Sequence, residues 1–74
     1  MQAKRFAVCL RNKGYEVSLE RRKIYQVLRD PTAARHGQVR IIDESGEDYL
    51  YPAGYFVAVE LPREAERALA RAAR

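Results

Sequence analysis

Few side chains in this sequence could carry out catalysis, and their spacing does not bring them together. Cys9 and His36 are the single cysteine and the single histidine, so the chain alone cannot supply a nucleophilic triad or a zinc site rich in these residues. Cys9 falls in a short apolar run, which is typical of a small core residue. A lone cysteine also allows no intramolecular disulfide, in keeping with a reducing cytoplasm. The sequence therefore predicts no enzyme and no cofactor.

The carboxylates gather in an acidic string over residues 43–48. This string lacks the alternate-position oxygens and the terminal glutamate of a twelve-residue calcium loop, so we expect no metal site. Ser-Gly between two β-type runs instead predicts a tight turn in which Gly46 takes positive φ. The turn would display three acids for binding: Glu44, Glu47 and Asp48.

Residues 48–61 carry three tyrosines and a phenylalanine and organise the rest of the chain. They predict a strand, a one-turn corner over residues 52–55 and a second strand over residues 56–61. The corner begins at a proline, which lacks the amide hydrogen that a strand needs. We interpret this corner and the acidic turn as one surface for a protein partner. Its aromatic part consists of Tyr51, Pro52 and Tyr55.

The residues before this stretch predict the sheet against which it closes. Apolar runs predict strands over residues 6–10, 24–28 and 38–43, with one helical turn over residues 32–35. Residues 15–20 alternate between apolar and polar, which predicts one dry side. That side would consist of Tyr15, Val17 and Leu19.

The chain is expected to end in a helix over residues 62–74. Pro62 is tolerated in a first helical turn, and glutamates follow it at the positive end of the helix dipole. One stripe of this helix is apolar, and a second stripe is basic. The apolar stripe consists of Ala65, Leu69 and Ala72, and the basic stripe of Arg63, Arg67, Arg71 and Arg74.

The net charge of +4 conceals segregation along the chain. Residues 1–40 hold ten basic and three acidic residues, whereas residues 41–62 hold five acids and no base. Segregated charge suits a protein partner, and the basic segments leave nucleic-acid binding as the alternative. In that alternative, Tyr25 would stack on a base. The phosphates would be contacted by Arg21, Arg22, Lys23, Arg40, Arg67 and Arg71.

Two segments resemble the Src homology 3 (SH3) family. Residues 16–28 (Glu-Val-Ser-Leu-Glu-Arg-Arg-Lys-Ile-Tyr-Gln-Val-Leu) are similar to its diverging turn and the strand that follows. Residues 51–56 (Tyr-Pro-Ala-Gly-Tyr-Phe) are similar to its second hallmark. The resemblance implies an n-Src-type loop over residues 29–37 and a distal hairpin over residues 43–48. It also places Pro52 and Tyr55 at positions of the family's peptide groove.

The groove aromatics of the family are largely missing. Cys9 and Arg11 stand where the groove has tyrosines, and the chain has no tryptophan. A polyproline ligand packs between such aromatic walls, so the resemblance does not extend to proline-rich peptides. The chain is similar to bacterial SH3-like barrel proteins of unassigned function.

These observations predict one small all-β domain, because 74 residues leave no room for a second core. We expect a five-stranded SH3-like barrel over residues 1–61 and an appended helix over residues 62–74. No apolar run is long enough to span a membrane, and the N-terminus has no signal-peptide pattern, so we expect a cytoplasmic protein. The expected function is non-catalytic binding of an unknown protein partner, which includes a second copy of the chain.

Overall fold

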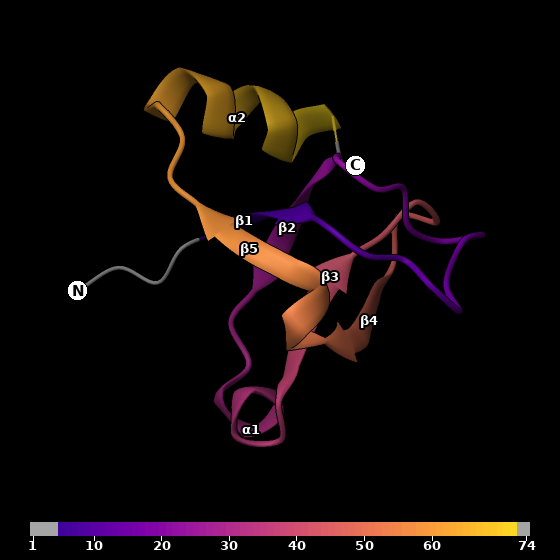
Figure 1. Ribbon diagram of the computed structural model, residues 1–74. Coiled ribbons are helices and arrows are strands. Elements are labelled where there is room, and N and C mark those ends of the chain that lie inside the picture. Colours follow the sequence, from indigo (N-terminus) through magenta and orange to yellow (C-terminus); the bar gives the residue numbers. More distant parts are fainter. Residues whose placement is uncertain (1–4, 73–74) are drawn as a thin grey trace.

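The computed structural model describes residues 5–72, with side chains up to Leu69. It contains five antiparallel strands and a C-terminal helix, as the sequence predicts (Figure 1). The elements in chain order are β1 (Phe6–Cys9), β2 (Ile24–Leu28), α1 (Pro31–Arg35), β3 (Gln38–Ile42), β4 (Asp48–Pro52), the 3-10 turn η1 (Ala53–Tyr55), β5 (Phe56–Val59) and α2 (Arg63–Ala72).

The strands form one sheet in the order β4-β3-β2-β1-β5. Strand β2 belongs to both halves of this sheet: Ile24–Gln26 pair with β1, and Val27–Leu28 pair with β3. Strands β4 and β5 are the two outer strands, and within residues 5–72 no ladder joins them. The sheet is therefore not closed into a barrel by hydrogen bonds.

The core lies between the two halves of the sheet and includes one loop residue. Its buried cluster consists of Cys9, Leu19, Tyr25, Ile41 and Tyr51, with Val27, Val39 and Phe56 packed against it. Every strand contributes an inward side chain, so the packing of both halves depends on the same cluster. The thiol of Cys9 is fully buried, which raises its pKa. The interpretation of this cysteine as a core residue is confirmed.

The predicted dry side of residues 15–20 is wrong. Val17 is 98% exposed and Tyr15 is 37% exposed, and only Leu19 enters the core. The segment forms turns instead of an extended strand, because the amides of Ser18 and Leu19 both donate to the carbonyl of Tyr15. Alternation indicates a strand only where a neighbouring strand can pair with the backbone. Here the backbone amides form local hydrogen bonds within the segment instead.

Several turns contain a glycine with positive φ, and the one at Gly46 is the turn predicted for the acidic string. Gly14 and Gly46 have φ values of 88° and 85°, a conformation that glycine adopts without steric cost. Arg22 also has positive φ, at 72°, and its amide donates to the carbonyl of Cys9 at 2.7 Å. This bond holds the basic turn of residues 21–23 against the end of β1.

The two helices lie at opposite ends of the molecule (Figure 1). Helix α1 begins at Pro31 and is capped by Asp30, whose Oδ1 accepts the amide of Ala33 at 3.0 Å. In α2, Ala65 and Leu69 are partly buried, whereas Arg63 and Arg67 are exposed. The described part of the helix thus separates the apolar and basic stripes as predicted.

Candidate interaction surface

The connection from β4 to β5 is the predicted corner, and one tyrosine fixes the long loop against it. Pro52 precedes the turn η1, and Tyr55 ends it. The carbonyl of Tyr55 accepts the amides of Leu10 and Arg11, at 2.8 Å and 3.3 Å. Its hydroxyl donates to the carbonyl of Lys13 at 3.0 Å. The loop between β1 and β2 is therefore attached to η1 through the main chain and the side chain of Tyr55.

The same contacts assemble an aromatic surface. The ring of Tyr15 lies edge-on to the rings of Tyr51 and Tyr55, with centroid distances of 4.9 Å and 6.0 Å. The guanidinium of Arg11 lies 5.8 Å from the ring centroid of Tyr55, within the range of a cation–π contact. Tyr15 is exposed, and Pro52 and Tyr55 are half-buried. We call the group Arg11, Tyr15, Pro52 and Tyr55 the corner surface.

Tyr51 supports this surface from within the core. Its ring is buried, and its hydroxyl donates to Asp43 Oδ2 at 2.5 Å and lies 2.9 Å from Ser18 Oγ. Burial and the hydrogen bond to Asp43 raise the pKa of Tyr51 to about 12. The structure therefore places this predicted binding residue beneath Tyr15, where it orients the exposed ring.

The three acids of the predicted surface lie away from the corner. Gln38 pairs with Pro52 at one end of the β3–β4 ladder, and Ile42 pairs with Asp48 at the other. Four residue steps along an extended strand separate these ends by about 13 Å. Glu44 and Glu47 follow β3 at the far end, beside Asp48. The sequence-predicted set is thus split into an aromatic and an acidic part.

Most of the acidic string is already paired within the protein. Lys23 Nζ lies 2.6 Å from Glu44 Oε2, and Arg40 Nη1 lies 2.8 Å from Asp48 Oδ2. Asp43 is buried, and its Oδ1 accepts the amide and the hydroxyl of Ser45. Hydrogen bonds from Lys23 and from a tyrosine hydroxyl lower the pKa of Glu44. Of the four acids in residues 43–48, only Glu47 is both exposed and without a basic partner among the described side chains.

These pairs also engage two of the six predicted phosphate contacts, Lys23 and Arg40. Arg40 bonds Asp30 as well as Asp48, at 2.8 Å each, and Lys23 is held by Glu44. Tyr25 is only 5% exposed, and its hydroxyl donates to Glu44 Oε2 at 2.5 Å, so its ring offers no face to a base. Burial and the bond to Glu44 raise the pKa of Tyr25.

The other basic candidates are exposed. Arg21, Arg22 and Arg67 are exposed, and among the described side chains they form no ion pair with a carboxylate. The side chain of Arg71 lies outside the described residues. The structure brings Arg21 and Arg22 to the base of the long loop, whereas Arg67 lies on α2.

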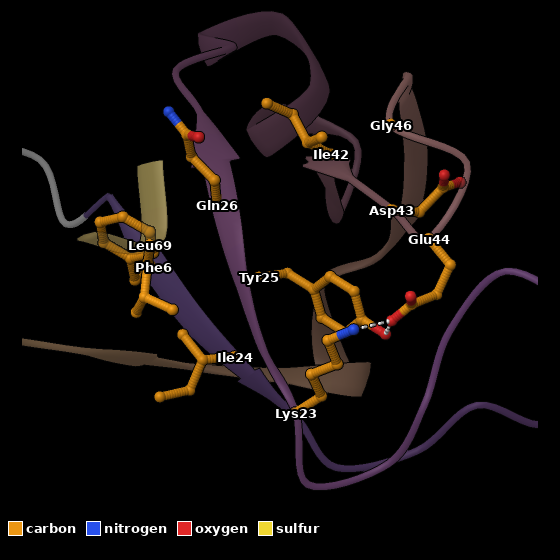
Figure 2. A pocket seen from close by; sticks show the side chains of 10 residues that line it. All are labelled: Phe6, Lys23, Ile24, Tyr25, Gln26, Ile42, Asp43, Glu44, Gly46 and Leu69. Carbon is orange, nitrogen blue, oxygen red and sulfur yellow. Dashed lines mark hydrogen bonds and ion pairs between the residues drawn. The ribbon is translucent and has the colours of Figure 1, made fainter. Parts of the chain in front are cut away.

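A shallow pocket of about 220 Å³ lies between β2, the β3–β4 turn and α2. Figure 2 shows Phe6, Ile24 and Leu69 on its apolar side and the Lys23–Glu44 pair with Tyr25 on its polar side. Leu69 is the residue of α2 that lines this pocket. Because Lys23 and Glu44 are paired with each other and Asp43 is bonded to Ser45 and Tyr51, we place the candidate site at the corner.

Two residues of the corner surface are not predicted from the sequence to bind a partner. The alternation predicts Tyr15 on the dry side, and the resemblance places Arg11 where the family has a groove tyrosine. The available signal was the loop itself: a segment between two strands that contains Gly14 folds back on its neighbours, and so can bring an aromatic to the surface.

Neither a metal cluster nor a spanning helix is found in the part of the chain that the structure describes. Over residues 5–72, no three His, Cys, Asp or Glu side chains gather as metal ligands. None of the described helices is both long and apolar enough to cross a membrane. No protein-family model matches the chain, and comparison with curated proteins and with solved structures finds no significant match. The site must be interpreted from its own geometry.

Proposed function

We propose that the protein is a non-catalytic binding module whose corner surface binds a segment of a protein partner. The observation that carries the proposal is the packing of Tyr15 on Tyr55, with Arg11 over the Tyr55 ring. Tyrosine and arginine are, with tryptophan, the side chains most enriched at the energetic centres of protein interfaces. Because the loop is bonded to η1, these groups are positioned before a partner arrives, which reduces the entropy lost on binding.

We further propose that the fold is an SH3-like small barrel with an altered groove. The long β1–β2 loop, the β3–β4 hairpin and the 3-10 turn before β5 support this assignment. Tyr15 and Arg11 would then form the groove wall in place of the family's aromatics. Location in the cytoplasm stays a prediction from the sequence.

Selection from a random peptide library against the full chain tests the proposed function. We expect selected peptides to bind the wild type and to lose at least about tenfold in affinity for the double variant Tyr15→Ala/Tyr55→Ala. Tyr49→Ala is the matched control, since Tyr49 is exposed but lies toward the opposite end of β4. Equal binding to the double variant, or no enrichment on the wild type, would refute the proposal. Circular dichroism verifies that the variants fold.

Nucleic-acid binding is the second candidate, and one observation favours it. The acidic string is largely neutralised by Lys23 and Arg40, while Arg21 and Arg22 are exposed. A steep loss of oligonucleotide affinity with salt would support this alternative. If Arg21→Gln/Arg22→Gln left the affinity unchanged, the alternative would fail.

A further inference from the structure

The charged groups around the corner surface specify the chemistry of its ligand. We infer, on the basis of the function proposed above, that the corner surface binds a peptide segment that carries carboxylates. The inference rests on which charges are paired inside the protein, on the orientation of the tyrosine rings and on the hydrogen-bonding capacity of Arg11.

The loop between β1 and β2 is basic, and among the described side chains its basic residues before Lys23 form no ion pair with a carboxylate. Residues 10–22 hold four basic and two acidic residues. Among the described side chains, the three ion pairs involve only Lys23 and Arg40 as cations. Glu16 and Glu20 in the same loop offset half of the four positive charges. Glu44 and Asp48 are paired with Lys23 and Arg40 at the far end of the β3–β4 ladder. The corner therefore presents an excess of positive charge.

Hydrogen bonds to the backbone place Lys13 beside Tyr55, and Arg21 and Arg22 beside the start of the same loop. The carbonyl of Lys13 lies 3.0 Å from the Tyr55 hydroxyl, so the exposed Lys13 side chain starts beside the corner surface. The bond from the Arg22 amide to the Cys9 carbonyl places the exposed Arg21–Arg22 pair beside the first residues of the same loop. Opposite charge on a partner would be attracted here and would orient its approach.

Arg11 is suited to hold a carboxylate. Its guanidinium lies over the Tyr55 ring, which fixes the planar group without using all its N–H donors. A carboxylate can then accept two parallel hydrogen bonds from one guanidinium. Tyr15, beside it, offers apolar ring surface to the residues that flank the acid.

The same geometry disfavours a single-stranded nucleic acid as the ligand. Stacking of successive bases requires several free aromatic faces, but Arg11 lies over the ring of Tyr55, and the rings of Tyr15 and Tyr55 meet at 75° and so do not form a parallel platform. Tyr25, the other stacking candidate, is buried. Carboxylates need only the cations, whereas bases need the ring faces.

The test is a titration of the 15N-labelled full chain with capped peptides of alternating acidic and leucine residues. A Glu-Leu peptide should shift the amides of Arg11, Tyr15 and Tyr55, and the matched Gln-Leu peptide should bind at least about tenfold more weakly. Arg11→Gln and Lys13→Gln, tested separately, should each weaken the Glu-Leu peptide about fivefold. Arg67→Gln removes an exposed arginine on α2 and should leave the affinity unchanged.

Each outcome of this experiment decides a different point. If the Gln-Leu peptide bound as tightly as the Glu-Leu peptide, the acidic specificity would be wrong and the proposed function would stand. If no peptide shifted the corner amides, and library selection also failed, both would be wrong. If oligothymidylate bound more tightly than the Glu-Leu peptide at the same residues, the ligand would be nucleic acid and the inference would be overturned.

Discussion

The hydroxyl of Tyr51 in β4 lies 2.5 Å from Oδ2 of Asp43, the first residue after β3. This contact joins the core to the turn that connects the two strands. Asp43 also accepts bonds from the amide and hydroxyl of Ser45, at 2.9 Å and 2.6 Å, so both oxygens of a buried carboxylate have donors. Because the ring of Tyr51 packs against Tyr15, the same residue supports the corner surface from below.

Replacement of Tyr51 by phenylalanine should destabilise the protein by about 1–3 kcal/mol, because the buried Asp43 would lose the donor to its Oδ2. Urea unfolding followed by circular dichroism measures the change. Tyr49→Phe is the matched control: its hydroxyl contacts Glu47 at the surface, at 3.3 Å, and its removal should change stability little. Equal effects of the two substitutions would show that the Tyr51–Asp43 bond contributes nothing beyond an exposed contact.

Acid should destabilise the protein through Asp43 and Glu44. Burial alone would raise the pKa of Asp43, but hydrogen bonds from Ser45 and Tyr51 outweigh it and leave the pKa below its ordinary value of 3.8. The bonds from Lys23 and Tyr25 lower the pKa of Glu44 from its ordinary 4.5. A lowered folded-state pKa contributes stability above the unfolded-state value, and this contribution is lost as pH falls through the folded-state value.

The unfolding free energy should therefore decrease from about pH 5 to about pH 3. Urea titrations at a series of pH values measure this slope. Glu44→Gln keeps an oxygen that can accept the hydroxyl of Tyr25 but removes one titrating group, so its acid slope should be shallower than that of the wild type. Identical slopes would mean that Glu44 titrates in the folded state as it does in the unfolded state.

Glycine positions offer a test that depends on backbone conformation alone. Gly46 has a φ of 85°, in the left-handed region, whereas the φ of Gly54 lies outside that region. At both positions an added Cβ would have no other atom within 4 Å. Gly46→Ala should therefore cost about 1 kcal/mol or more through left-handed strain, whereas Gly54→Ala should be neutral or slightly stabilising. Thermal unfolding of the two variants compares them directly. A similar loss for both would point to packing instead of φ.

Much of the architecture could be predicted because its signals are local. The helical turn after Pro31, the glycine turns and the corner at Pro52 each depend on residues adjacent in the sequence. The dry side predicted for residues 15–20 is wrong because alternation specifies a strand only when a partner strand is available. Here the carbonyl of Tyr15 instead accepts the amides of Ser18 and Leu19 in a turn. Val17 shows the consequence, since its apolar side chain is almost fully exposed.

The site was harder to predict because it depends on register and on contacts far apart in the chain. Tyr55 and Lys13 are 42 positions apart, and Lys23 and Glu44 are 21 apart. No periodicity reveals such pairs before the strands are aligned. The acidic string therefore looked like a binding surface, although Lys23 and Arg40 hold two of its members. Charge counted along a sequence does not measure the charge that a surface presents.

The bond from the Tyr55 hydroxyl to the Lys13 carbonyl should hold the loop between β1 and β2 in place. Tyr55→Phe removes this bond and keeps the ring, so global stability should fall by no more than about 1 kcal/mol. The loop would open more often, and the Tyr15 amide, which donates to Asn12 at 2.8 Å, should exchange its hydrogen several-fold faster. Hydrogen exchange followed by NMR measures this rate, with the Val27 amide in β2 as the internal control. Equal acceleration of both amides would indicate global destabilisation, and no acceleration at Tyr15 would show that the main-chain bonds of Tyr55 alone fix the loop.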